Sequence, residues 1–276
     1  MKQPSDQLKL GAILSYVSTG LNMAVQLLYT PLMIRLLGQS EYGLYTLVGS
    51  VVSYLSLFSL GFTGAYLRFY SQRRAKNDEE GIARLNGMFL TVFCVMSLAA
   101  LVCGMVLLRF PRALFGNRLT AREVGTARIL MAILVVNIAL TFPAGLLESM
   151  VTAREKFLFQ QLVTLAGVLF NPLLCLPLLL MGFGSVAVVS VTTFLTIAKL
   201  VVSAWYCVKK LHVRFRFDGF DFGVLREIAG FSFFLFLNML INQINWSVDK
   251  DILGRLSGKE AVAVYGVGAQ VNCLVI

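Results

Sequence analysis

Two groups of polar side chains repeat at helical spacing inside long apolar stretches of this sequence. The first group is spaced i, i+4, i+7 and consists of Asn22, Gln26 and Tyr29. The second is spaced i, i+4, i+7, i+11 and consists of Asn238, Asn242, Asn245 and Asp249. At these spacings each group shares one face of a helix. Because polar groups are costly in lipid, such faces either line a polar cavity or join helices by hydrogen bonds. The two matched groups favour a cavity.

Basic side chains in the same stretches would add positive charge to that cavity. Lys199 precedes Lys209 by ten positions, which is about 15 Å at helical rise, so its ammonium cannot easily extend to the membrane surface. We predict that Lys199 faces a wet interior. Arg68 and Arg128 lie nearer helix ends, where they either line the cavity or reach lipid headgroups. Such cations would attract an anionic ligand.

Enzyme motifs are absent from the sequence. It contains no phosphate-binding GxxxxGK[ST] loop, no HExxH helix and no GxSxG nucleophile turn. The single histidine, His212, leaves little for a metal site or a catalytic triad, and the cysteines lack the paired spacing of metal or redox motifs. We therefore predict no catalytic residue, no metal, no cofactor and no enzyme activity.

Composition and run lengths place the chain in a membrane. Of 276 residues, 58% are apolar and 14% are charged, whereas soluble domains are about half apolar and a quarter charged. Apolar runs long enough to span a bilayer cover residues 10–36, 43–69, 85–109, 124–150, 157–181, 184–208 and 226–248, and another begins near 260. Prolines expected to bend these helices are Pro31, Pro143, Pro172 and Pro177. The runs predict an all-α, polytopic membrane helical bundle of about eight helices.

The distribution of positive charge predicts the orientation of the chain. The net charge of +10 comes from Lys and Arg that lie mainly between the apolar runs, not in a surface suited to nucleic acid. With the N-terminus in the cytoplasm, the cytoplasmic loops hold more of these residues than the outer loops, as the positive-inside rule requires.

An internal repeat predicts how the helices are grouped. A displacement of 220 residues aligns RLLGQSEYGLY, which begins at Arg35, with RLSGKEAVAVY, which begins at Arg255. With a small change of offset, the first polar group also aligns with the second. Parallel repeats of this kind occur in secondary transporters. We predict a first six-helix lobe at residues 1–225 and the start of a second, truncated lobe at 226–276, which lacks about four helices.

Three segments resemble a known family: PLMIRLLGQSEYGLY, GFTGAYLRFYSQ and DKDILGRLSGKEAVAVYGVGAQV. They are similar to the polysaccharide flippases, the O-antigen, capsule and exopolysaccharide exporters of the multidrug/oligosaccharidyl-lipid/polysaccharide (MOP) superfamily. The resemblance implies a MATE-like, two-lobed bundle of twelve or more helices that opens alternately to either side. It also implies that an undecaprenyl-diphosphate-linked oligosaccharide is carried, with its sugar head in a basic, polar cavity and its lipid tail in the bilayer.

These observations together predict a multi-pass protein of the bacterial inner (plasma) membrane that flips lipid-linked oligosaccharide repeat units for cell-surface polysaccharide biosynthesis. The expected partners are the undecaprenyl-diphosphate oligosaccharide, membrane lipids and the polysaccharide polymerase machinery, but no nucleic acid. Two alternatives remain. A cation-coupled multidrug exporter of the same superfamily would favour buried carboxylates, of which Asp249 is the candidate. A non-transporting membrane scaffold in polysaccharide assembly is the other.

Overall fold

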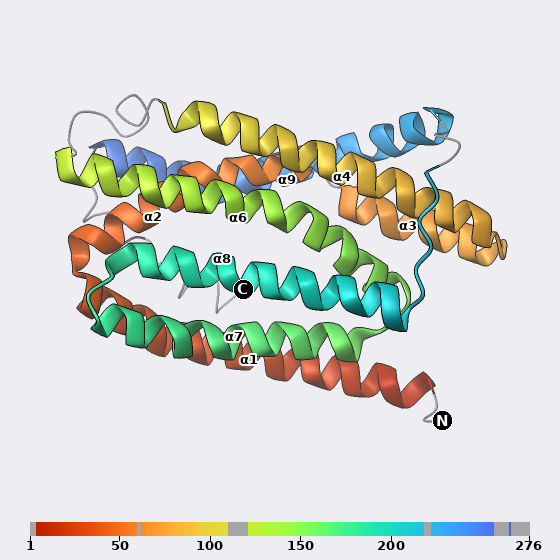
Figure 1. Ribbon diagram of the computed structural model, residues 1–276, viewed down its shortest axis with the longest axis horizontal. Helices are drawn as coiled ribbons and strands as arrows, with labels where there is room; N and C mark the ends of the chain where they lie inside the picture. Colours follow the sequence, from red (N-terminus) through yellow and green to blue (C-terminus); the bar gives the residue numbers. More distant parts are fainter. Residues whose placement is uncertain (1–3, 60–61, 110–120, 218–221, 257–264, 266–276) are drawn as a thin grey trace.

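Long helices that run side by side make up the structure (Figure 1). The computed structural model describes residues 4–59, 62–109, 121–217, 222–256 and 265. In chain order the helices are α1 (Pro4–Leu37), α2 (Gln39–Ser53), η1 (Tyr54–Ser59), α3 (Phe62–Ala75), α4 (Glu79–Leu107), α6 (Ala121–Ala153), α7 (Phe157–Leu180), α8 (Gly184–Trp205), η3 (Tyr206–Lys210) and α9 (Phe222–Leu256). The described residues contain no strand, so the all-α prediction is confirmed.

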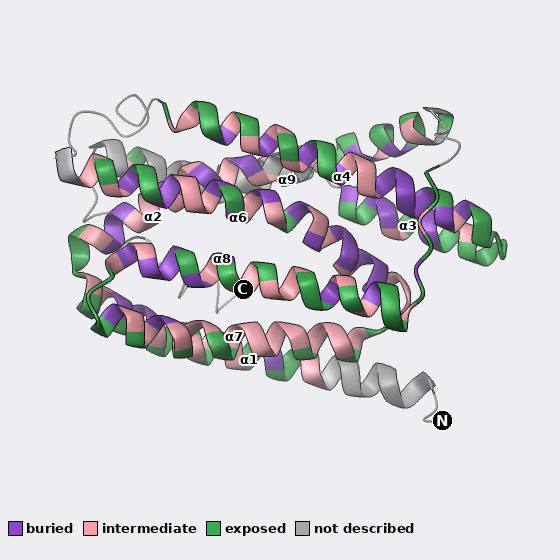
Figure 2. Ribbon diagram, viewed as in Figure 1, coloured by how far each residue is buried: buried purple, intermediate pink, exposed green. Residues whose placement is uncertain are grey.

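Several helices have the length and composition of membrane spans. Within the described residues these are Leu14–Leu37, Glu79–Leu107, Glu123–Ala153, Phe157–Leu180 and Gly184–Lys210. Their outer faces expose large apolar side chains, among them Leu98, Leu173 and Phe194 (Figure 2). A soluble protein would bury such side chains, whereas lipid solvates them. These features indicate a multi-pass membrane protein.

Helix α6 lies at the centre of the packing. It contacts α8, α4, α2 and α3, and it contributes to two buried apolar clusters, with Met131 in one and Leu146 in the other. Helix α1 lies along α7, and α9 lies against α2, α3 and η1. We call the end of the bundle at which α1 begins the proximal end and the opposite end the distal end. The proximal end is on the right in Figure 1.

The run predicted as one helix over residues 43–69 is divided, so that prediction is wrong. Helix α2 ends at Ser53, the 3₁₀ helix η1 follows, and α3 begins at Phe62. The hydroxyls of Ser50, Ser53 and Ser56 donate to the carbonyls three residues earlier, at 2.9, 2.7 and 2.6 Å. Serine hydroxyls that bond back in this way compete with the helical pattern, and the chain tightens into a 3₁₀ turn.

The other helices predicted before residue 250 are present, with ends shifted by up to eight residues. The helix predicted to begin near 260 lies almost entirely outside the described residues. The four prolines named above lie inside α1, α6 and α7, as predicted. The second copy of the predicted repeat, residues 255–265, also lies largely outside the described residues. The repeat and the two lobes therefore stay predictions.

A carboxylate ties the distal ends of α2 and α8 together. Glu41 Oε1 accepts hydrogen bonds from Ser185 N at 2.7 Å and from Ser185 Oγ at 2.8 Å. The first N–H groups of a helix lack partners within that helix and attract negative charge, so a carboxylate at the start of α8 is favourable. Gly184 permits this approach because it has a φ of 65° and because a Cβ there would collide with Glu41.

Gly104 lets α4 approach α6 closely, since a Cβ on this residue would collide with the side chain of Val135. We expect Gly104→Ala to destabilise the protein by about 1–3 kcal/mol, as overpacked cores do, and so to lower the midpoint of thermal unfolding in detergent. Adding Val135→Ala removes the colliding methyl groups and should restore much of the loss. Gly145→Ala is the control, because a Cβ there meets nothing within 4 Å. An equal loss in the control would contradict the packing explanation.

Candidate functional site

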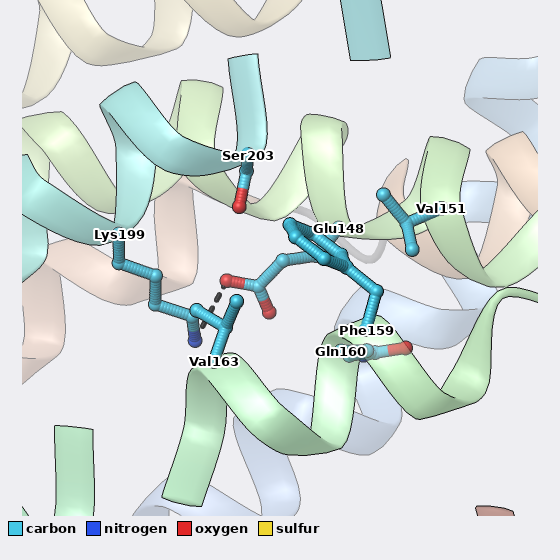
Figure 3. Close-up of a pocket in the computed structure, with 7 residues that line it drawn as sticks. All are labelled: Glu148, Val151, Phe159, Gln160, Val163, Lys199 and Ser203. Carbon is cyan, nitrogen blue, oxygen red and sulfur yellow. Dashed lines mark ion pairs between the residues drawn. The ribbon is translucent and has the colours of Figure 1, made fainter. Parts of the chain in front are cut away.

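An ion pair joins α8 to α6 near the proximal end of the bundle (Figure 3). Lys199 Nζ lies 2.8 Å from Glu148 Oε1, and the two side chains keep 36% and 29% of their surface exposed. Helices α6 and α8 both run from the distal to the proximal end and pack against each other. Lys199 was predicted from the sequence as a cavity residue, whereas Glu148 was not assigned a role.

A small cavity surrounds this ion pair. It has a volume of about 10 Å³, which is roughly the space that one water molecule needs. The residues that line it come from α6, α7 and α8 and are Glu148, Val151, Phe159, Gln160, Val163, Lys199 and Ser203. Its apolar walls lower the local dielectric and so strengthen the attraction between the two charges. The partial exposure of both side chains weakens that attraction again.

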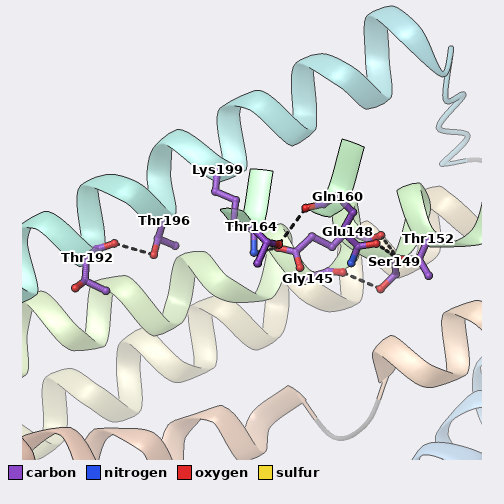
Figure 4. A network of polar contacts seen from close by, with 9 residues as sticks. All are labelled: Gly145, Glu148, Ser149, Thr152, Gln160, Thr164, Thr192, Thr196 and Lys199. Atoms are coloured by element: carbon purple, nitrogen blue, oxygen red, sulfur yellow. Dashed lines mark hydrogen bonds and ion pairs between the residues drawn. The ribbon is translucent and has the colours of Figure 1, made fainter. Parts of the chain in front are cut away.

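Hydroxyl and amide groups extend the polar contacts along the same three helices (Figure 4). Thr152 Oγ1 donates to Gln160 Oε1 at 2.8 Å and joins α6 to α7. Asn137 Nδ2 donates to Thr196 Oγ1 at 3.0 Å and joins α6 to α8. We call this set of side chains the polar seam, and its members are Asn137, Glu148, Thr152, Gln160, Thr196 and Lys199. The seam places one ammonium and one carboxylate among neutral hydrogen-bonding groups.

The seam was not predicted from the sequence, although the signal was present. Four polar residues of α8 follow the spacing i, i+4, i+7, i+11, and they are Thr192, Thr196, Lys199 and Ser203. Polar residues of α6 fall on one face in a similar way, and they are Asn137, Thr141, Glu148 and Thr152. The same spacing was used to recognise the groups in α1 and α9, so it would have identified these faces as well.

In the polar group predicted in α1, Gln26 is exposed and Asn22 and Tyr29 are half-buried. Gln26 Nε2 donates to Asn22 Oδ1 at 3.0 Å, which places both amides on one face, as their spacing predicts. Tyr29 packs against a buried cluster that includes Met33 and Cys175. Neither the hydrogen bond between the amides nor the packing of Tyr29 connects this group to the polar seam. Whether the face of Asn22 and Gln26 lines a cavity stays a prediction.

The other predicted site residues lie away from Lys199. The Arg68 guanidinium lies 4.5 Å from the ring centroid of Phe231, so it joins α3 to α9. Arg128 is exposed on α6, twenty residues from Glu148, or about 30 Å at helical rise. The structure does not gather these arginines around the ion pair.

The polar group in α9 can be followed only in part. Asn238 is exposed, and the side chains of Asn242, Asn245 and Asp249 lie outside the described residues. Helix α9 packs against α2, α3 and η1, whereas α1 packs against α7, α2 and α8. The predicted arrangement, in which α1 and α9 face each other across a cavity, therefore stays a prediction.

The described residues offer no cluster of three or more His, Cys, Asp or Glu side chains that could hold a metal ion. The groups of the seam can form hydrogen bonds, and the Lys199 ammonium can exchange one anionic partner for another. Glu148 neutralises Lys199 in the observed arrangement, and the ammonium would become available to another anion if that carboxylate were displaced.

Solved transporter structures share this fold. An inward-facing multidrug resistance MATE family transporter of the MOP superfamily superposes with a TM-score of 0.77 and 14% identity, over 91% of this chain and 58% of that one. The MATE multidrug transporter DinF-BH gives 0.73 and 16%, over 98% and 61%. A MOP superfamily transporter from Pyrococcus furiosus gives 0.70 and 15%, over 96% and 60%. The fold is that of MOP superfamily transporters, and the chain spans about 60% of the length of these structures.

A family match is more specific than the shared fold. Residues 8–275 match the family described as "Polysaccharide biosynthesis protein". The chain belongs to this family, and the resemblance inferred from the sequence is confirmed. No curated protein matches the chain at a significant level.

Replacing either partner of the Lys199–Glu148 pair alone should destabilise the protein, because the remaining charge would be left unpaired in a site that is only partly solvated. We expect Lys199→Met and Glu148→Gln each to lower the midpoint of chemical unfolding in detergent. The double variant should lose less than the sum, by a coupling free energy of about 1 kcal/mol. The exposed pair formed by Arg84 and Glu80, 3.7 Å apart, is the control and should show almost no coupling. Equal coupling in the two pairs would argue against a special role for the seam.

Proposed function

We propose that this chain takes part in moving oligosaccharides linked to undecaprenyl diphosphate across the bacterial inner membrane, for the synthesis of cell-surface polysaccharide. The observation that carries the proposal is the match to the polysaccharide biosynthesis family over residues 8–275. The MOP transporter fold supports it, because the family and the fold are those of transporters rather than enzymes. In this proposal the N-terminus is cytoplasmic, so the proximal end faces the cytoplasm.

The polar seam carries chemical groups suited to the proposed cargo, although in the observed arrangement its cavity of about 10 Å³ has room for one water molecule only. A diphosphate carries more negative charge than the single carboxylate of Glu148, so it competes effectively for the Lys199 ammonium at low dielectric. The hydroxyls of Thr152 and Thr196 and the amide of Gln160 provide the kinds of hydrogen bond that sugar hydroxyls form. Since the carboxylate returns to the ammonium once the anion has left, the pair would bind and release its ligand reversibly.

Membrane lipids and the polysaccharide polymerase machinery are the further partners that this function requires. A multidrug exporter and a non-transporting scaffold would share the same fold, so the fold alone does not separate them from a flippase. The three functions differ in the lipid that accumulates when the protein is lost. Only a flippase leaves its lipid-linked oligosaccharide behind.

We expect deletion of the gene to make undecaprenyl-diphosphate oligosaccharide accumulate in the membrane, because a blocked translocation step retains its substrate. Mass spectrometry of extracted lipids measures this accumulation. Expression of the 276-residue chain should relieve it, and Lys199→Met should do so at least about tenfold less well, as expected when a charged hydrogen bond is lost. Lys209→Met, which removes an exposed lysine of η3, is the matched control and should act like the unaltered chain.

No accumulation after deletion would contradict a flippase and favour the exporter or the scaffold. Accumulation that the chain fails to relieve would contradict the view that these residues suffice for translocation. If Lys199→Met and Lys209→Met relieve the lipid accumulation equally well, Lys199 is not part of the site. Membrane abundance of each variant is measured by immunoblotting, so that loss of protein is not read as loss of transport.

A further inference from the structure

A second and much larger cavity opens at the proximal end of the bundle. Its volume is about 600 Å³, and it shares no lining residue with the cavity around Lys199. The walls come from the end of α3, the start of α4, the loop after α6 and the segment that follows η3. Charged and polar groups on these walls include Tyr70, Arg74, Asn86, Arg154, His212 and Arg214.

One wall is a segment without helix or strand, residues 211–217, which crosses the proximal part of α4 (Figure 1). Arg216 N donates to the carbonyl of Ala83 at 3.0 Å, and Asn86 Nδ2 donates to the carbonyl of Arg214 at 3.0 Å. The close approach requires glycine at position 87, because a Cβ there would collide with the Arg216 carbonyl. Hydrogen bonds to the backbone of residues 211–217 thus hold this wall in place. They do not involve the side chain of Arg214.

The cavity carries an excess of positive charge. Three guanidinium groups and one imidazole line it, against the single carboxylate of Glu79. Among the described residues none of Arg74, Arg154 and Arg214 forms an ion pair. Arg74 Nη1 donates only to the neutral hydroxyl of Tyr70, at 3.1 Å. This contrasts with Lys199, whose charge is neutralised within the chain.

Arg154 lines this cavity, and its guanidinium carbon lies 5.9 Å from the ring centroid of Tyr70. Its Nη1 atom is buried, and the described residues provide it with no hydrogen-bond partner. A buried charged donor without an acceptor is costly, and such groups are rare in folded proteins. An anion that enters the cavity from outside the chain would supply the acceptor.

The loops that form the cavity are held in uncommon backbone conformations. The described residues other than glycine with positive φ are Asn77, Glu155 and His212, at 54°, 59° and 49°. Asn77 and His212 line the cavity, and Glu155 follows Arg154 directly. Such conformations cost energy and persist where the surroundings hold them, often at ligand-binding sites. The protein's own contacts therefore hold these loops in place beside the cavity.

We propose that this cavity binds a phosphate-bearing ligand, with Arg154 as its central contact and with Arg74 and Arg214 beside it. The planar guanidinium group matches phosphate oxygens in a two-point geometry, which makes arginine the usual choice for this anion. The cavity is much larger than one phosphate, so it admits the group to which the phosphate is attached. This site does not depend on the proposed function, because any phosphate carrier of suitable size fits it.

The position at the helix ends leaves two sources for the phosphate: a membrane lipid headgroup and a water-soluble compound. We would measure both with the purified full chain. Inorganic diphosphate is titrated while thermal unfolding is followed in detergent, and lipid retention is measured by native mass spectrometry from nanodiscs of phosphatidylglycerol or phosphatidylcholine. We expect diphosphate to raise the unfolding midpoint, or phosphatidylglycerol to be retained in preference to phosphatidylcholine.

Arg154→Gln should weaken this binding at least about tenfold, because it removes charged hydrogen bonds. It should also raise the unfolding midpoint of the ligand-free protein, since it removes a charged group whose buried Nη1 atom has no hydrogen-bond partner among the described residues. Arg84→Gln is the matched control: it removes a proximal arginine that lies outside the cavity, paired with Glu80, and should leave binding unchanged. If Arg154→Gln does not fold, Arg214→Gln replaces it, because the wall is held by the Arg214 carbonyl and not by its side chain.

The outcomes separate the two sources. Stabilisation by diphosphate indicates a water-soluble ligand, whereas selective retention of phosphatidylglycerol without that stabilisation indicates a lipid headgroup. If the unaltered chain binds neither probe, or if the cavity variant and Arg84→Gln bind equally well, the proposal is overturned.

Discussion

Lipid provides no hydrogen-bond partners, so every polar side chain inside the spanning helices must find its partner within the bundle. Helix α6 provides many of these partners. Its polar face reaches α8 through Asn137 and Glu148, and it reaches α7 through Thr152. Because these contacts lie on one face, they fix three helices in a single register. The apolar clusters on the other sides of α6 then pack α4, α2 and α3 against the same helix.

Hydropathy predicts helices well in such a protein because the bilayer demands long apolar runs. It failed within residues 43–69, where the run is apolar on average but the α-helix ends at Ser53. The cause is local: serine hydroxyls bond back to the carbonyls three residues earlier. Counting apolar residues ignores this competition, so a stretch rich in serine reads as one uninterrupted helix.

The site was harder to predict than the fold because spacing shows which residues share a face but not which faces meet. The depth of Lys199 indicated a wet environment, and the structure places it beside Glu148. That carboxylate precedes Arg154 by six residues, whereas Lys199 precedes Lys209 by ten. The difference of four residues is about 6 Å along a helix, which a lysine side chain can bridge. The sequence of α6 alone gave no role to Glu148, and only its position beside a second helix of the same direction makes it the partner of Lys199.

Among the described residues, Lys199 is paired with a carboxylate of the chain, whereas Arg154 is not, and this difference affects the free energy with which each would bind an anion. An anion that approaches Lys199 must first displace Glu148, so part of its binding free energy is lost in breaking an existing pair. An anion that approaches Arg154 meets a guanidinium with an unsatisfied donor, so none of its binding free energy is lost in breaking an ion pair. If both sites bind anions as we propose, the proximal cavity is the stronger attractor for a first encounter, because the excess of positive charge around it would raise the local concentration of anions. The paired lysine suits a step in which binding must be reversible, because the displaced carboxylate competes to return.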